Sequence, residues 1–385
     1  MARSRPAPSA RSCDSLLPRD YYVSEDIFRQ ELERVFLRQW TFLGHISELP
    51  AIGDFLRQDL FGESVVVARC GKEQIRAFLN VCRHRGHHLC AAERGHQQSF
   101  VCPYHRWTYG LDGSLKHAPG FTDGVGMHYG DYTLHSVRIE LWHGFIFGWL
   151  GTTPGPTLAS CLTFDETSLR RLQPEHIKEI HREDYVIAAN WKVLLENYLE
   201  CYHCHGSHPE LCVAMDVEAT YRNTDEGWKS EYFSGHLQLR PGMLTGSMTG
   251  ALVSRPLGEF AGTQSMPEGF GAGIGVVPAL TRIIFHIDHA LVHVLRPIDV
   301  GHVRWETRWY VAADAVEGKD YTVADVTEVW RRTNAEDIAL CESAYRGVRS
   351  RRYVPGPLHP RREGAIRPAL DTYLALMGLA GPSPL

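Results

Sequence analysis

Two short loops, each with one cysteine and one histidine, constrain the fold of this chain more than any other feature of its 385 residues. The first loop reads Cys82-Arg-His84-Arg-Gly, and the second reads Cys102-Pro-Tyr-His105. The segment between them is long enough for two β-loops to face each other. From about residue 41 to 155 the chain reads as short β-runs separated by glycine-rich turns, which indicates a small all-β domain around the loops.

Two cysteines and two histidines suit two kinds of metal centre. One is a structural zinc site with four protein ligands. The other is a [2Fe–2S] cluster in which two cysteines bind one iron and two histidines bind the other. The Cys-x-His spacing favours the cluster, because zinc fingers usually pair cysteine with cysteine and histidine with histidine. His87, His88, Cys90 and His96 lie nearby without matching partners, so we expect them not to be ligands.

Both loops and the residues that follow them resemble the Rieske domain of the non-haem iron ring-hydroxylating oxygenases. The similar residues include Arg85-Gly86 and the run His105-x-Trp107-x-Tyr109-x-Leu-Asp112-Gly113. The resemblance extends from about Leu17 to Leu376 and is closest to the branch that contains choline, carnitine and betaine oxygenases. It implies that Cys82, His84, Cys102 and His105 hold a [2Fe–2S] cluster.

A second group of metal-binding residue types lies at residues 196–210, which read Glu-Asn-Tyr-Leu-Glu-Cys-Tyr-His-Cys-His-Gly-Ser-His-Pro-Glu. The apolar spacing predicts a helix over residues 190–202. Glu200 and His203 are three residues apart and should therefore share a face of that helix. A glycine then interrupts the helix and lets His208 turn back towards His203.

This window resembles the family motif Asp/Glu-x2-His-x4-His. The resemblance implies that His203 and His208 bind a mononuclear iron. It also implies that Glu200 accepts a hydrogen bond from a Rieske histidine of a neighbouring subunit. His205 has the right residue type at the wrong spacing. A solvated polar helix face is the alternative, and the metal-binding loops elsewhere in the chain make it the weaker one.

The third iron ligand is expected on a helix over residues 323–349, where Asp337 falls in the middle of an apolar stripe. A carboxylate that faces a protein core must be paired or bound to metal. Two histidines and one carboxylate are the usual ligands of a non-haem iron that activates oxygen. The resemblance assigns this role to Asp337, and a salt bridge to Arg331 or Arg332 is the alternative.

These patterns predict an α+β fold in which an all-β Rieske domain is inserted into a catalytic domain with a helix-flanked antiparallel sheet. Residues 1–40 form a tail and a helix of the catalytic domain, residues 41–155 the Rieske domain, and residues 156–385 the mononuclear iron domain. Residues 281–311 alternate in polarity and read as sheet. Residues 241–275 contain nine glycines and read as a long loop that suits a mobile lid.

Composition excludes several classes of protein. The net charge of −5 disfavours nucleic-acid binding through a general positive field. No run approaches the roughly 18 apolar residues that a transmembrane helix needs. Ten cysteines without a secretory signal indicate a reducing, cytoplasmic location, where cysteines are buried, metal-bound or catalytic. The Gly-x-Gly-x-x-Gly fingerprint of dinucleotide binding is absent from the sequence.

The resemblance therefore implies an O2-dependent monooxygenase that forms homotrimers. Its electrons come from NAD(P)H through a separate reductase of the flavin and ferredoxin type. The expected substrate is a small quaternary or tertiary amine such as a betaine, held by an aromatic cage. Phe285, Trp305 and Trp309 could form such a cage, but plain core packing is the more common role of aromatic residues in a sheet. An aromatic-ring dioxygenase, an electron-transfer Rieske protein and a zinc-stabilised binding module remain open.

Overall fold

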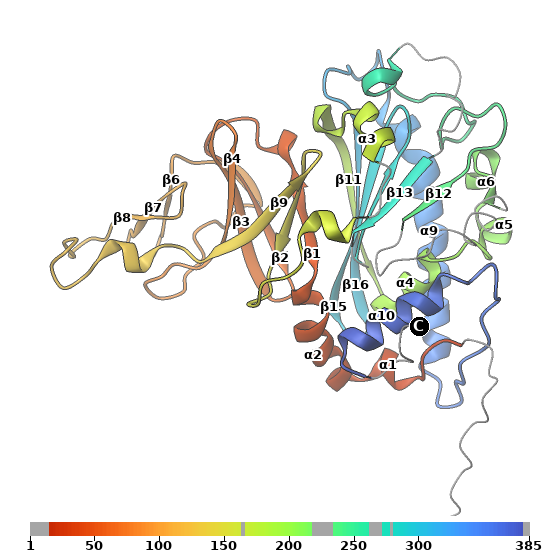
Figure 1. Ribbon diagram of the computed structural model, residues 1–385, viewed down its shortest axis with the longest axis horizontal. Coiled ribbons are helices and arrows are strands. Elements are labelled where there is room, and N and C mark those ends of the chain that lie inside the picture. The colour runs from red at the N-terminus through yellow and green to blue at the C-terminus, as the bar shows by residue number, and fades with distance from the viewer. Residues whose placement is uncertain (1–14, 163–165, 218–233, 262–271, 278–279, 380–385) are drawn as a thin grey trace, which may run out of the picture.

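The structure is a computed structural model that describes residues 15–162, 166–217, 234–261, 272–277 and 280–379. A β domain and a mixed helix-and-sheet domain lie next to each other, as Figure 1 shows. Every strand pair in the described sheets is antiparallel. The predicted α+β fold with a helix-flanked antiparallel sheet is confirmed.

The β domain consists of a seven-stranded sheet and a three-stranded sheet. In spatial order, the larger sheet contains β1 (Trp40–His45), β10 (Phe145–Trp149), β9 (Ser136–Trp142), β4 (Gln74–Leu79), β3 (Glu63–Gly71), β2 (Asp54–Leu60) and β5 (Arg94–His96). The smaller sheet contains β6 (Ser99–Val101), β7 (Thr108–Gly110) and β8 (Leu115–His117). The small sheet lies at the left end of the molecule in Figure 1, away from the mixed domain.

The mixed domain is built on a six-stranded sheet. In spatial order, its strands are β11 (Ile177–Ile187), β16 (His302–Ala312), β15 (Ala290–Asp299), β14 (Thr281–Phe285), β13 (Ala272–Val277) and β12 (Ser234–Leu237). Strands β14 to β16 confirm the sheet predicted over residues 281–311. The predicted loop over residues 241–275 is too long, because β13 already begins at Ala272. Residues 262–271 of that loop lie outside the described residues.

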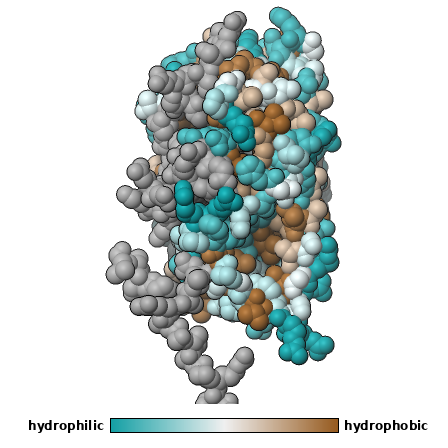
Figure 2. All heavy atoms as spheres, turned by 90° about the vertical axis from the view of Figure 1, so that its right-hand side faces the viewer, coloured by the Kyte–Doolittle hydropathy of each residue, from teal (hydrophilic) through white to brown (hydrophobic). Residues whose placement is uncertain are grey.

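Helices cover one face and one end of this sheet. They are α1 (Asp20–Val23), α2 (Glu25–Arg34), α3 (Glu166–Leu172), α4 (Trp191–Tyr198), α5 (Cys204–Ser207), α6 (Leu211–Ala214), α9 (Val323–Val348) and α10 (Ile366–Leu376). Helix α9 confirms the long helix predicted over residues 323–349. Among the described residues, no helix has the length and apolarity needed to cross a bilayer. Figure 2 shows one face of this domain, where hydrophilic residues are interspersed with small hydrophobic groups.

A buried ion pair attaches the N-terminal helix to the mixed domain. Glu31 of α2 and Lys192 of α4 are both fully buried, and their Oε1 and Nζ atoms are 2.5 Å apart. The same carboxylate accepts hydrogen bonds from Trp191 Nε1 at 2.8 Å and from the Tyr373 hydroxyl at 2.6 Å. Helix α2 is therefore fixed to α4 and α10, although the whole β domain separates them in the sequence.

Charged and aromatic contacts join the two domains. Arg308 of β16 is fully buried and donates from Nη1 to Glu48 of the β domain at 3.0 Å. On the same face of the sheet, the rings of Phe285 and Phe145 lie 6.0 Å apart. One face of the six-stranded sheet thus packs against the β domain, while α4 and α9 cover the other face (Figure 1).

Candidate cluster loops and mononuclear metal site

Each of the two Cys/His loops is a tight turn that returns to its own cysteine. The backbone N–H of Gly86 donates to Cys82 O at 2.9 Å, and that of Arg106 donates to Cys102 O at 3.0 Å. Gly86 and Arg106 have φ angles of 74° and 62°, in the left-handed region that closes such turns. The turns bring the histidine of each loop to the same side as its cysteine.

Four candidate ligands meet between these loops. The His84 and His105 rings lie 4.6 Å apart, and the Nδ1 atom of each is buried without a hydrogen-bond partner. The Cys82 and Cys102 thiols are buried next to each other, and burial together with this contact raises the pKa of Cys102. Thiols of this kind ionise only beside a strong positive charge. Two buried thiols and two unpartnered ring nitrogens fit a Rieske [2Fe–2S] cluster.

The neighbouring cysteine and histidines are placed differently. His87 and His88 are exposed, and His96 contacts Asp54 at 2.9 Å. Cys90 is buried among apolar side chains, and burial raises the pKa of its thiol to about 12. None of these residues belongs to the group formed by the four candidate ligands.

The helix before the second site is shorter than the sequence predicts. Helix α4 ends at Tyr198, so Glu200 and His203 do not share a helix face. Instead, the Glu200 carboxylate accepts the backbone N–H groups of Tyr202 and His203 and thereby closes a turn. Such local side-chain bonds compete with helix continuation. Tyr202, which the spacing places on the buried face, is 49% exposed.

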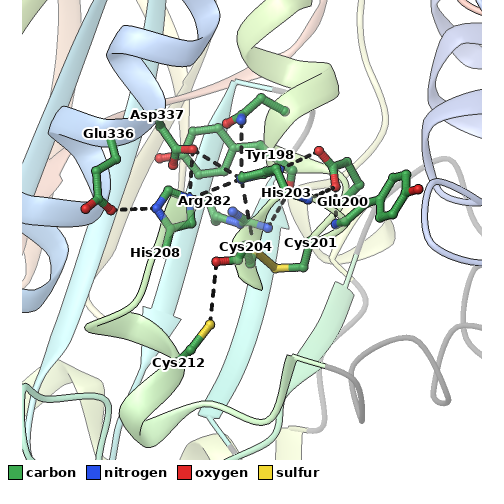
Figure 3. Close-up of a disulfide and its surroundings, with 12 residues drawn as sticks. Tyr198, Glu200, Cys201, His203, Cys204, His208, Cys212, Arg282, Glu336 and Asp337 are labelled. Atoms are coloured by element: carbon green, nitrogen blue, oxygen red, sulfur yellow. Dashed lines mark hydrogen bonds and ion pairs between the residues drawn. A yellow bond between two sulfur atoms is a disulfide. The ribbon is translucent and has the colours of Figure 1, made fainter. Parts of the chain in front are cut away.

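His203, His208 and Asp337 nevertheless converge, as Figure 3 shows. The two Nε2 atoms lie 3.1 Å apart, and Asp337 Oδ1 is 3.3 Å from His203 Nε2 and 3.1 Å from His208 Nε2. His208 and Asp337 are 1% and 7% exposed. Three ligand atoms from α9 and from both ends of α5 therefore face one point inside the domain, which is the donor set of a two-histidine, one-carboxylate iron site.

Each histidine is oriented by a second carboxylate behind it. Glu200 Oε1 is 2.5 Å from His203 Nδ1, and Glu336 Oε2 is 2.7 Å from His208 Nδ1. A carboxylate at Nδ1 accepts the ring N–H and leaves the lone pair on Nε2, where a metal can use it. Sequence analysis missed Glu336, because helical phase places it outside the apolar stripe. Its position next to Asp337 was the available signal.

The carboxylates around His203 and His208 favour a positive charge at this site. Burial opposes ionisation of Asp337, but hydrogen bonds from His203 and His208 outweigh it and lower its pKa to about 2. Burial likewise opposes the charged form of His203, but hydrogen bonds to Asp337 and Glu200 raise its pKa to about 9. Protons on the imidazoles thus fill the role that a metal ion fills in the loaded site.

The salt-bridge alternative for Asp337 is wrong. Arg331 pairs with Glu183 at 2.6 Å, and Arg332 pairs with Glu210 at 2.8 Å. Both arginines therefore point away from the site. Asp337 is buried, and among the described residues the two histidines are its partners within ion-pair distance.

One cysteine pair departs from the expectation of reduced thiols. Cys201 and Cys204 form a disulfide across a three-residue separation, with their Cα atoms 4.9 Å apart. The Cys204 sulfur lies near His203 and His208, within 4.8 Å of their ring nitrogens. A disulfide sulfur is not a thiolate, so Asp337 rather than Cys204 completes the donor set. The turn after α4 explains the pairing, because it brings the two Cα atoms within disulfide range.

The three aromatic residues considered for a cage lie apart from one another. Phe285 lies on the face of the sheet that packs against the β domain. Trp309 packs against His181, with ring centroids 5.5 Å apart. Trp305 alone faces the site, 5.0 Å from the Tyr198 ring and 5.3 Å from the His293 ring. Core packing therefore describes Phe285 and Trp309, and the three residues do not form one cage.

Comparison with known proteins identifies two families in the chain. Residues 39–130 match the Rieske [2Fe-2S] domain, and residues 174–378 match the ring hydroxylating alpha subunit (catalytic domain). The glycine betaine monooxygenase oxygenase subunit of Pseudomonas aeruginosa is 33% identical over 97% of this chain and 92% of its own length. The carnitine monooxygenase oxygenase subunit of Escherichia coli is 33% identical over 56% of this chain and 58% of its own length.

Solved structures share the fold. The quaternary ammonium Rieske monooxygenase CntA in complex with an inhibitor superimposes with a TM-score of 0.75 at 24% identity, over 94% of this chain and 95% of the other. Naphthalene 1,2-dioxygenase with bound indole gives a TM-score of 0.69 at 23% identity, over 94% of this chain and 92% of the other.

A Rieske domain joined to the catalytic domain of a ring hydroxylating alpha subunit defines the oxygenase component of a non-haem iron enzyme. The chain belongs to the ring-hydroxylating oxygenase alpha-subunit family. It is an oxidoreductase that incorporates molecular oxygen, with a [2Fe–2S] cluster and a mononuclear iron. The electron-transfer protein and the zinc-stabilised binding module are thereby excluded.

Proposed function

We propose that this chain is the oxygenase subunit of a monooxygenase that removes an N-methyl group from a small quaternary or tertiary amine such as a betaine. The observation that carries the oxygenase chemistry is the convergence of His203, His208 and Asp337 within 3.3 Å of one another. The relatives that act on glycine betaine and carnitine support an amine as the substrate.

His203, His208 and Asp337 would bind the mononuclear iron, and Cys82, His84, Cys102 and His105 would bind the cluster. When bound, these groups supply one-electron transfer and the activation of O2. Within this scheme, Glu200 and Glu336 hold the imidazoles with their Nε2 lone pairs towards the metal. We assign residues 1–40 and 156–385 to the catalytic domain and residues 41–155 to the inserted Rieske domain.

The overall reaction balances with one oxygen atom of O2 in formaldehyde and the other in water. The amine, O2, NAD(P)H and a proton give the demethylated ammonium, formaldehyde, water and NAD(P)+. Hydroxylation of the methyl carbon next to nitrogen gives a carbinolamine, which releases formaldehyde when its C–N bond breaks. A separate NAD(P)H-dependent reductase of the flavin and ferredoxin type would supply the electrons, consistent with a cytoplasmic enzyme.

The arrangement of the two sites supports electron transfer between subunits. The small sheet that carries one cluster loop lies at one end of the molecule, and α5 lies on the opposite side (Figure 1). We therefore propose a head-to-tail homotrimer, in which a neighbour's Rieske domain approaches this face. Glu200 would bridge the two centres, because its side chain is 11% exposed and contacts His203.

Aromatic-ring dioxygenation is the second candidate, and the similarity to the naphthalene 1,2-dioxygenase fold favours it. Coupled turnover with a compatible reductase separates the two candidates when formaldehyde and hydroxylated products are measured by mass spectrometry. N-methylated amines should release formaldehyde, and Asp337→Ala should abolish the release. A diol from an aromatic acid, without formaldehyde from any amine, would contradict the amine proposal.

The trimer has its own test. Sedimentation at assay concentration should give three chains per particle. Glu200→Gln should leave both metals bound while slowing re-reduction of the mononuclear site, because the bridging carboxylate loses its charge. A fully active monomer would contradict this part of the proposal.

A further inference from the structure

Arg282 lies beside the candidate metal site and has no acidic partner among the described residues. Arg282 of β14 donates from Nη2 to the backbone O of Tyr198 at 2.8 Å, and its Cζ lies 4.5 Å from the centroid of the Tyr198 ring. Its Nε atom is buried and has no hydrogen-bond partner. In the view of Figure 3, the Arg282 side chain lies behind the space between His203 and His208.

Three other arginines of this domain have a buried carboxylate as partner. Arg182, Arg296 and Arg308 all pair with the buried carboxylate of Glu306, at 2.5, 3.3 and 2.5 Å. Arg282 has no carboxylate within 4.0 Å among the residues that the structure describes. A buried charge without a partner is costly, and guanidinium cannot escape the cost by losing its proton. An anion that binds beside Arg282 would remove this cost.

A cavity adjoins the guanidinium. The empty space there is about 340 Å³ when open solvent is included, and apolar side chains dominate its wall. Its lining residues are Leu195, Tyr198, Leu199, Leu280, Thr281, Arg282, His293 and Leu295. His293 is held neutral, because burial keeps its pKa well below the ordinary value. Arg282 is therefore the one formal charge among the lining residues.

The cavity is next to the candidate iron ligands. Tyr198 and His293 line it and contact each other through the tyrosine hydroxyl and Nδ1. Figure 3 shows Tyr198 and Arg282 next to His203, His208 and Asp337. A ligand in this cavity would therefore lie between a fixed cation and the point where the three ligand atoms meet.

We propose that Arg282 is the anchor for a carboxylate of the substrate, so that the amine oxidised here is a zwitterion of the betaine type rather than a simple monocation. The inference rests on the proposed function for the amine part of the ligand. A guanidinium fork matches a carboxylate in shape and charge. Like charges would disfavour a choline-like cation that has nothing to offer Arg282.

Binding to the anaerobic holoenzyme tests the proposal without turnover. Isothermal titration calorimetry would compare glycine betaine, its amide analogue without the carboxylate, and benzoate. Wild type should bind the betaine about 10 to 100 times more tightly than the amide, which is the range for a hydrogen bond to a charged group. Arg282→Gln should lose that difference, and Arg282→Lys should keep part of it.

Arg304→Gln is the matched control, because Arg304 lies exposed on the same sheet in β16. It should leave all three affinities unchanged. If Arg282→Gln does not fold, as judged by its cluster absorption, the wild-type comparison of betaine with its amide and the Arg282→Lys variant still decide the question.

The outcomes distinguish the role of Arg282 as a carboxylate anchor from the proposed oxidation of an amine. If amines bind but betaine and amide bind equally, or Arg282→Gln leaves betaine affinity within about twofold, the anchor is wrong and the amine function stands. If only benzoate binds, and does so through Arg282, the anchor stands and the amine function is wrong. If no carboxylate ligand depends on Arg282, the inference is overturned.

Discussion

Replacement of Glu336 tests whether the carboxylates behind the histidines set iron affinity. Glu336 Oε2 lies 2.7 Å from His208 Nδ1, and its side chain is 32% exposed. His208 itself is 1% exposed. The contact with Glu336 fixes the orientation of its ring, and this orientation directs Nε2 inwards. Loss of the acceptor frees the ring to rotate and to take the other tautomer.

The size of the effect follows from this exposure. Removing an outer partner of a metal-binding histidine typically costs about 10 to 100-fold in metal affinity. Water can reach Glu336 and replace part of the lost bond, so Glu336→Ala should weaken iron binding by about tenfold, near the lower end. Glu336→Gln keeps an acceptor and loses only a partly exposed charge. An exposed charge pair contributes about 0–1 kcal/mol, so iron affinity should fall at most about fivefold.

Iron affinity is measured by competition with a coloured ferrous chelator, and the Rieske absorption reports on folding. Glu342→Gln is the control, because Glu342 is also on α9 but accepts the backbone N–H of Ala188 at 3.0 Å. Asp337→Ala marks the full loss of an iron ligand. An iron affinity of Glu336→Ala equal to that of the Glu342→Gln control would refute the reasoning.

Three further predictions concern the cluster and the fold. Cys102→Ser should abolish the visible cluster absorption while the mononuclear iron remains, as metal analysis would show, since the two sites share no ligand. Glu31→Gln should destabilise the protein by about 3–5 kcal/mol, because it leaves the Lys192 charge buried without its partner. In denaturant melts, the loss of unfolding free energy for Glu31→Gln combined with Lys192→Met should be smaller than the sum of the losses for the single changes. Burial raises the pKa of Glu196 from 4.5 to about 8, so its contribution to stability is fully present below pH 4.5 and is lost as the pH rises towards 8. The melting temperature of Glu196→Gln should accordingly vary less than that of wild type across this range, and parallel curves would contradict the assignment.

The sequence predicts best what a short motif or a helical period determines. The Cys82 and Cys102 loops, the long helix that carries Asp337 and the strands after residue 281 all follow from local spacing. Each lies where tertiary contacts and local preference agree. The position of Asp337 within an apolar stripe was informative, because a buried carboxylate needs a partner.

Prediction fails where a side chain replaces the backbone bonds of a helix. The spacing after Asn190 favours a helix through Tyr202, but the Glu200 carboxylate takes the N–H groups that would continue it. The same turn brings Cys201 and Cys204 together as a disulfide. The role of Phe285 stayed open for another reason: strand alternation does not tell which face of a sheet meets the second domain.

The charges around the metal site divide it into two sides. Glu200 and Glu336 lie on the outer side, with side chains 11% and 32% exposed, and each contacts an imidazole away from the metal. Arg282 lies on the inner side, at a cavity with an apolar wall. Negative charge on the outer side favours the imidazole orientation that would bind iron. Positive charge on the inner side favours a ligand that carries an anion. The two carboxylates and Arg282 therefore act on different steps, and their variants should separate iron affinity from ligand affinity in the same protein.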